Sequence, residues 1–155
     1  MVIEVAMGEI AVAKSGESLC ASGVGSCAII MLYDTKSKIG GLAHAMLSFS
    51  RNEQRTAKSA GIMPDFRYVV PAIDEMLKKM TASGAQKKCI VAKLAGGANM
   101  FSAFTSSIGL DNIRSAKEKL HKEGIILAGE AVGGSQGRTV ELNTATGIVT
   151  VKTKF

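Results

Sequence analysis

The sequence predicts a single α+β domain spanning residues 1–155. Short runs of β-type residues lie at both ends of the chain, and two segments with helical periodicity lie apart from one another between them. This order differs from the regular strand–helix alternation of a parallel α/β sheet. A chain of 155 residues, 46% of them hydrophobic and 21% charged, can bury the core of one domain.

Strands account for most of the expected secondary structure. Their apolar residues come in short runs bounded by glycine or by polar turn residues. The expected strands are residues 2–7, 10–13, 28–33, 41–47, 88–94, 125–132, 138–143 and 148–154. A Thr-Ala-Thr-Gly turn at residues 144–147 predicts that the last two strands pair as a hairpin.

Two helices are expected, at residues 65–83 and 111–123. In both, apolar residues recur at spacings of three and four, as on the core-facing side of a helix. Asp65 is a suitable N-cap for the first helix, and Gly84 a suitable end. Pro71 is tolerated only in the first turn, which favours a start nearer Val70.

Two further segments are expected to be loops. Residues 48–64 form the longest polar stretch and follow His44 closely, so they are either one wall of a site or a solvated connection. Residues 96–101 begin with two glycines after an expected strand. This predicts a sharp turn whose exposed amides can bind an anion.

The main candidate for chemistry is the pair Cys27 and His44. Imidazole can take a thiol proton and later return it to a leaving group. If residues 34–37 form the loop between two antiparallel strands, Cys27 and His44 are predicted to lie directly opposite each other, on one face of the sheet. A slip of one residue would place them on opposite faces.

The alternative is that Cys27 is a small buried hydrophobe and His44 a core histidine with its hydrogen bonds satisfied. The glycines before the cysteine favour the functional interpretation. Gly23 and Gly25 predict a tight turn with backbone N–H groups free to point at a ligand. Gly25 and Ser26 are therefore the candidate oxyanion-binding positions beside the nucleophile.

Composition excludes several other classes. The net charge of +6 favours acidic partners, but aromatic residues are only 5% and no nucleic-acid recognition motif is present. No apolar run approaches the roughly 18 residues of a membrane helix, so we expect a cytoplasmic protein without membrane insertion. An odd cysteine count without CxxC spacing favours a reducing compartment and no metal site, with Cys89 an inert core thiol.

Four blocks of the sequence resemble the CheD family, the chemoreceptor glutamine deamidases of bacterial and archaeal chemotaxis. They occur in the family's order and at its separations over nearly the whole chain. The blocks are GVGSC at residues 23–27, GGLAHAML at 40–47, AKLAGGANMF at 92–101 and GGSQGRTVELNTATGIVTVK at 133–152.

The resemblance implies a fold, a reaction and partners. The fold would be a layered β-sandwich with helices packed outside, like that of cysteine deamidase toxins. Cys27 would attack the side-chain amide of glutamines on chemoreceptor cytoplasmic helices, and His44 would carry the proton. Methylglutamate esters would be hydrolysed in the same way, without a cofactor. A CheC-type phosphatase would be a second partner.

One position departs from the family pattern. The family threonine that orients the imidazole, six residues before the cysteine, is replaced here by Ala21. Ser22 is a candidate substitute, but on a regular strand its side chain would point to the other face, unless a bulge turns it. A backbone carbonyl or another side chain could orient His44 instead. A poorly oriented base lowers the rate. Two alternatives therefore stay open: a binding module with weak or no catalysis, and a thiol hydrolase of small amides.

Overall fold

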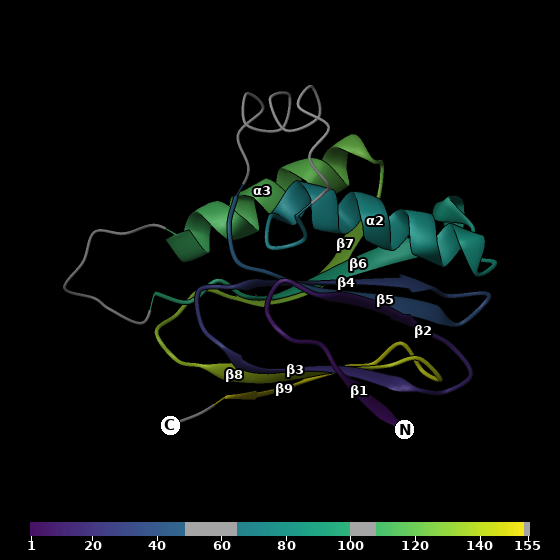
Figure 1. Cartoon of the computed structure of the whole chain (residues 1–155), viewed down its shortest axis with the longest axis horizontal. Helices are drawn as coiled ribbons and strands as arrows, with labels where there is room; N and C mark the ends of the chain where they lie inside the picture. The colour runs from purple at the N-terminus through teal and green to yellow at the C-terminus, as the bar shows by residue number, and fades with distance from the viewer. Residues whose placement is uncertain (49–64, 100–107, 154–155) are drawn as a thin grey trace.

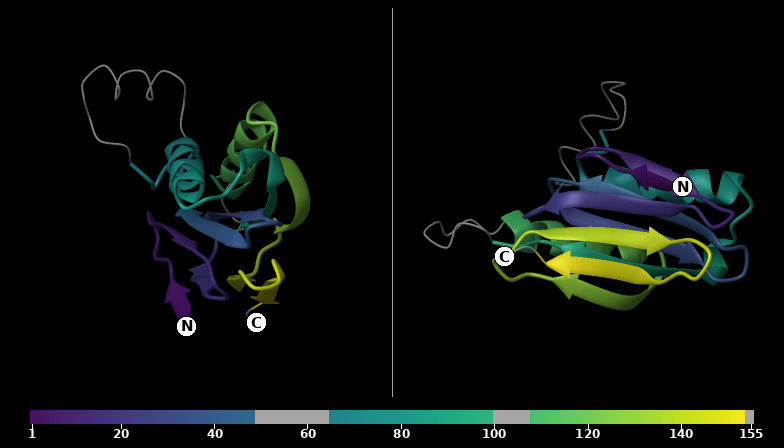
Figure 2. Two further views of the ribbon diagram at one scale, coloured as in Figure 1. Left: turned by 90° about the vertical axis from the view of Figure 1, so that its right-hand side faces the viewer. Right: turned by 90° about the horizontal axis from the view of Figure 1, so that it is seen from below.

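The computed structural model describes residues 1–48, 65–99 and 108–153, and these form three layers. Helices α2 and α3 lie over a five-stranded sheet, and a four-stranded sheet packs against the other face of that sheet (Figure 1). Both helices cover the same face, as the side view in Figure 2 shows. The α+β class, and sheets packed as a sandwich with helices outside, are confirmed.

The five-stranded sheet is the middle layer. Its strands, in spatial order, are β2 (Ile10–Ala13), β5 (Ile39–Ala45), β4 (Ala28–Asp34), β6 (Ile90–Gly96) and β7 (Ile126–Val132). Every residue of β4 and β5 is buried. Because helices cover one face of these strands and the second sheet covers the other, their sequences are nearly continuous apolar runs.

The four-stranded sheet has one buried and one solvated face. Its order is β1 (Val2–Glu4), β3 (Ser18–Val24), β8 (Arg138–Asn143) and β9 (Val149–Thr153). The predicted hairpin of β8 and β9 is confirmed. The first strand is shorter than expected and ends at Glu4, because the chain then crosses from this sheet to β2 of the other one.

The helices differ from expectation mainly at their starts. They run Val69–Ala82 (α2) and Ile108–Lys122 (α3). Pro71 lies in the first turn of α2, as predicted. The expected N-cap was wrong: Tyr68 occupies that position, and Asp65 instead accepts the backbone N–H of Arg67 at 3.0 Å. No helix in the described ranges is both long and apolar enough to cross a bilayer.

Two connections were not foreseen. The chain passes from β6 through α3 to β7, and these two strands pair in parallel, so a strand–helix–strand unit is built into the sandwich. A 3₁₀ turn, Lys87–Cys89, precedes β6, so Cys89 is half-buried in a turn instead of lying in a core strand. The expected surface loop at 48–64 falls, apart from its first residue, outside the described residues.

The core is divided by the middle sheet into two clusters. Side chains alternate between them along β4, with Ile30 and Leu32 on the helix side. Ile29 and Met31 lie between the two sheets, in the same cluster as Cys27. The candidate thiol is thus on the side of the middle sheet that faces β3 and β8.

Candidate active site

Cys27 and His44 share a face of the middle sheet, but they are not directly opposite. The turn falls at residues 35–38, one position later than predicted, and Asp34 still belongs to β4. His44 therefore pairs with Ile29, and the predicted direct opposition was wrong by two residues. Because side chains alternate with a period of two, this shift leaves both groups on the same face.

Both side chains lie in the space between the sheets. Ile29, the cross-strand partner of His44, belongs to the inter-sheet core, and residues paired across two strands point to the same face. His44 is 2% exposed and Cys27 is 8% exposed. The imidazole is thus held in an environment in which an unsatisfied polar atom is costly.

A backbone carbonyl holds the imidazole of His44. Its Nδ1 atom lies 3.0 Å from the carbonyl oxygen of Val5. Since a carbonyl can only accept, Nδ1 carries the proton and Nε2 of the neutral ring is an acceptor. The segment that supplies this carbonyl is itself fixed, because the Val5 N–H donates to Cys20 at 2.7 Å and the His44 N–H donates to Glu9 at 3.0 Å.

Nε2 of His44 is buried and unpaired. Within the described residues, it is one of two buried side-chain polar atoms without a hydrogen-bond partner. A histidine that served only the core would be expected to use both nitrogens. The combination of one anchored nitrogen and one free nitrogen is what a general base requires.

The loop before β4 is anchored through consecutive carbonyl groups. The carbonyls of Gly25, Ser26 and Cys27 accept hydrogen bonds from the Ala98 N–H (2.9 Å), the Asn112 Nδ2 (3.0 Å) and the Gly97 N–H (2.8 Å). A trans peptide group points its carbonyl and its N–H in opposite directions, and the described residues contain no cis peptide bond. The amides of Ser26 and Cys27 consequently point away from these donors.

The loop that follows β6 supports the cysteine loop, and its described amides, at residues 97–99, are not free. The prediction of an anion-binding turn there was wrong, because the N–H groups of Gly97, Ala98 and Asn99 all donate to protein carbonyls. Gly96 has a φ of +92°, and a Cβ at that position would lie 2.2 Å from the Cys27 carbonyl oxygen. Only glycine allows this close approach of the two backbones.

Burial raises the pKa of the Cys27 thiol, and a hydrogen bond from its own backbone N–H only partly offsets this effect. An ordinary cysteine titrates near pH 8.5, so the thiol is neutral at pH 7 in this state. The thiolate must therefore form during attack, with the proton passing to a base.

Ala21 and Ser22 lie on opposite sides of the four-stranded sheet. Ala21 is fully buried on the inner face, where it pairs with Val140. Ser22 is exposed at a β-bulge, and its N–H donates to the Glu4 side chain at 3.1 Å. The structure thus places the Ser22 hydroxyl away from the buried imidazole, whose Nδ1 is bound by a carbonyl instead.

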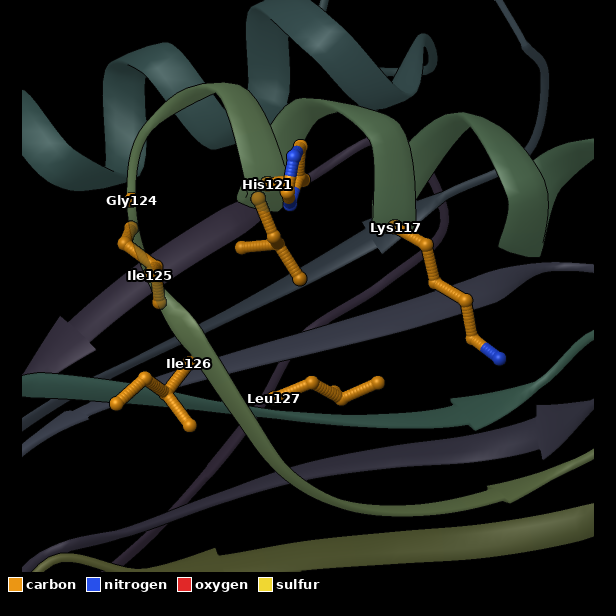
Figure 3. Close-up of a pocket in the computed structure, with 7 residues that line it drawn as sticks. Lys117, His121, Gly124, Ile125, Ile126 and Leu127 are labelled. Atoms are coloured by element: carbon orange, nitrogen blue, oxygen red, sulfur yellow. The ribbon is translucent and has the colours of Figure 1, made fainter.

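Two hollows lie away from the cysteine. One, of about 490 Å³, lies between the end of α3 and the start of β7, beside His121 and Ile126 (Figure 3). The other, of about 260 Å³, lies near Tyr33 at the far end of β4. Cys27 precedes the opposite end of β4 and lines neither hollow. The described residues contain no cluster of His, Cys, Asp and Glu that could hold a metal ion.

The chain is therefore a three-layer α+β domain with a buried cysteine and a buried histidine on one face of its middle sheet. The family model described as CheD chemotactic sensory transduction matches residues 46–153. A probable chemoreceptor glutamine deamidase CheD of Methanococcus maripaludis is 44% identical over 98% of this chain and 95% of its own length. The chain belongs to the CheD family.

Bacterial relatives agree with the archaeal one. The chemoreceptor glutamine deamidase CheD of Halalkalibacterium halodurans is 35% identical, over 98% of this chain and 93% of its own length. A probable chemoreceptor glutamine deamidase of Clostridium botulinum is 36% identical, over 97% of this chain and 91% of its own length. The similarity thus extends over the segments that carry Cys27 and His44.

Proposed function

We propose that this protein is a chemoreceptor glutamine deamidase of a chemotaxis system, with Cys27 as nucleophile and His44 as general base and acid. Membership of the CheD family and the names of its relatives support the activity. The observation that carries the assignment of residues is the state of His44. Its Nδ1 is anchored on Val5, and its Nε2 is buried and unpaired on the face that also holds Cys27.

The reaction follows from these two groups. The Cys27 sulfur attacks the side-chain amide carbon of a glutamine, and its proton passes to His44 Nε2. The imidazolium then protonates the amide nitrogen, so that ammonia leaves and a thioester remains. Nε2 next takes a proton from water, which adds to the thioester. The tetrahedral intermediate collapses, the sulfur regains the proton, and glutamate is released.

Backbone amides stabilise the oxyanion in this mechanism. The amides of Ser26 and Cys27 point away from the protein groups that bind the loop's carbonyls. Gly25 lies in the bend of residues 25–27 that connects β3 to β4. Donors fixed in advance of the reaction lower the barrier most, because they need no reorganisation as charge develops. A methylglutamate ester would follow the same path, with methanol leaving in place of ammonia.

The Val5 carbonyl takes the part that a threonine plays in the family pattern. It accepts the Nδ1 proton, fixes the tautomer and holds the ring. A side-chain hydroxyl at position 21 is then not required to orient the imidazole. This arrangement is consistent with full catalysis by a chain that lacks the family threonine.

The test is mass spectrometry of a chemoreceptor cytoplasmic fragment incubated with the protein. Conversion of glutamine to glutamate replaces an amide with a carboxyl group, and peptide mapping locates the change. We expect modification by the wild-type protein, none by Cys27→Ala, and a loss of about 10²–10⁴-fold in rate for His44→Gln. His121→Gln, on the exposed side of α3, is the matched control and should retain full activity.

A second candidate function is a binding module that regulates receptors or a CheC-type phosphatase. The raised pKa of the Cys27 thiol favours it, since a reactive cysteine usually has a lowered pKa. Binding of the same receptor fragment by wild type and Cys27→Ala, with no modification by either, would support this alternative and contradict the deamidase. A thiol hydrolase of small amides would instead act on free glutamine and leave the fragment unchanged.

A further inference from the structure

Asn112 of α3 connects the backbones that carry Cys27 and His44. Its side chain is fully buried, and its Nδ2 donates to the carbonyl of Ser26 at 3.0 Å and to the carbonyl of Met46 at 2.8 Å. Ser26 directly precedes the cysteine. Met46 follows the histidine by two residues. One amide group thus uses both of its hydrogens on the two segments that supply the chemistry.

The bridge lies where the sheet no longer fixes these segments. The last residue pair of β4 and β5 is Ala28 with Ala45. Ser26 and Met46 both lie beyond that pair, so no ladder hydrogen bond sets the distance between them. The planar amide of Asn112 sets it instead, because its two N–H groups have a fixed angle between them. Its contacts are to backbone atoms, so they fix the main chain itself.

The remaining atom of the amide is not used by the fold. Asn112 Oδ1 and His44 Nε2 are the two buried side-chain polar atoms without a partner in the described part of the chain. A buried acceptor without a donor destabilises the folded state. Stability alone therefore does not account for an asparagine here, and such unpaired groups concentrate at functional sites.

We infer that Asn112 is a positioning residue, which holds the Cys27 loop and the His44 strand end at the separation needed for proton transfer. The inference rests on the proposed function, since it assigns Asn112 a task in that same reaction. Asn112 acts in this role through the two backbones, by its hydrogen bonds to the carbonyls of Ser26 and Met46.

A double-mutant cycle tests it. Asn112→Leu removes the donor at similar volume, and Asn112→Asp keeps the shape but sets a carboxylate oxygen against two carbonyls. We expect Asn112→Leu to lower kcat by about 10- to 100-fold with KM changed less than about threefold. We also expect His44→Gln to cost at least about tenfold less in the Asn112→Leu background than in the wild type, because the base is already misplaced.

Leu120→Ala is the matched structural control. Leu120 is buried in the same helix, two turns further on, so its truncation destabilises the protein without touching either segment. Its effect should be additive with that of His44→Gln. Additive effects of Asn112→Leu and His44→Gln would overturn the inference, because they would reduce Asn112 to a structural residue.

A substrate-free measurement separates this inference from the proposed function. The rate at which iodoacetamide alkylates Cys27 is measured in the same variants by peptide mapping. Non-additive loss of alkylation supports the positioning role even if the wild type leaves the receptor fragment unmodified. An unmodified fragment would reject the deamidase proposal but not the positioning role.

If the variants do not fold, nuclear magnetic resonance of the wild type decides. Slow exchange of the Asn112 side-chain amide protons, with shifts on alkylation of Cys27, supports the bridge, and fast exchange overturns it.

Discussion

The Nδ1 atom of His44 lies 3.0 Å from the carbonyl oxygen of Val5, and both residues are buried. This contact joins the middle sheet to the segment that crosses over from the four-stranded sheet. It fixes which ring nitrogen carries the proton, and leaves Nε2 as the acceptor on the face shared with Cys27. The orientation of the imidazole is therefore set by a main-chain carbonyl. A side-chain substitution at position 21 does not remove this carbonyl.

Ala21→Thr restores the residue of the family pattern, and we expect it to change kcat by less than about threefold, or under ~1 kcal/mol in the barrier. The reason is that Nδ1 already has an acceptor. Ala21 is fully buried, so the added atoms should reduce stability by about 1–3 kcal/mol. Ala21→Val, which adds the same volume without a hydroxyl, is the control for packing. A rise in kcat of more than about tenfold for threonine alone would show that the carbonyl is a poor substitute.

The alkylation rate of Cys27 should rise with pH beyond the ordinary cysteine value of about 8.5. Burial raises the pKa of this thiol, so the reactive thiolate forms later than in a free cysteine. The measurement is the iodoacetamide rate between pH 6 and 10, in a variant in which Cys20 and Cys89 are both serine. A rate that is already constant below about pH 7 would contradict this prediction and indicate a preformed thiolate–imidazolium pair.

Gly96→Ala should impair both folding and deamidation. The new Cβ would lie 2.2 Å from the Cys27 carbonyl oxygen, at a φ of +92°, so the backbone beside the nucleophile must move. We expect a loss of at least about 1–3 kcal/mol in unfolding free energy, together with reduced kcat. Gly124→Ala is the control, because its φ is also positive, at +70°, but nothing lies within 4 Å of the new Cβ. Gly124→Ala should lose stability but keep the wild-type kcat. Equal kcat in both variants would contradict the argument.

Asp34→Asn should destabilise the turn that sets the register of β4 and β5. Burial acts to raise the pKa of this carboxyl, but the backbone N–H groups of Gln86, Ser37 and Lys36 outweigh it and hold the pKa below its usual value. We expect a loss of about 1–3 kcal/mol at neutral pH, because one acceptor becomes a donor facing the Gln86 N–H. Denaturant unfolding measures this loss.

The loss of stability in Asp34→Asn should also depend on pH. A carboxyl with a lowered pKa contributes stability above its unfolded value of about 3.9, and loses it as pH falls through the folded pKa. The difference between wild type and Asp34→Asn should therefore shrink below about pH 4. Glu118→Gln, on the exposed side of α3, should show little difference at any pH. A difference for Asp34→Asn that stays constant down to pH 2 would contradict the role of this carboxylate.

Elements with strong local signals were predictable. The apolar runs of β4, β5 and β8, and the periodicity of α2, depend on neighbours in sequence, and the structure has them within a few residues of the predicted ranges. The connections between the elements were less predictable from the sequence. Whether β7 joins β6 or β8 depends on contacts between distant segments, which no local pattern encodes. The N-cap at Tyr68 was missed because Asp65 pairs with Arg67 instead.

Some features of the candidate site were likewise predictable from the sequence, and others were not. Cys27, His44 and the family membership could all be reached from the printed residues. The tight turn expected at Gly23 was wrong, because Gly23 lies in β3, beside its bulge. The pairing of His44 with Ile29 could not, because a turn that starts one residue later moves the pairing by two. Asn112 gave no signal. That a backbone carbonyl could orient His44 was open from the sequence, but not that Val5 supplies it. A buried asparagine in a helix, or a main-chain oxygen, becomes part of a site only when another segment reaches it.

The sequence by itself determined the fold class, the thiol and imidazole, and the face of the sheet they share, because local propensity and a period of two encode these. Only the tertiary structure decided what anchors the imidazole, which groups hold the cysteine loop, and that the expected anion-binding amides at Gly97 and Ala98 are occupied. The physical reason is that hydrogen bonds between segments far apart in the chain depend on how the layers pack.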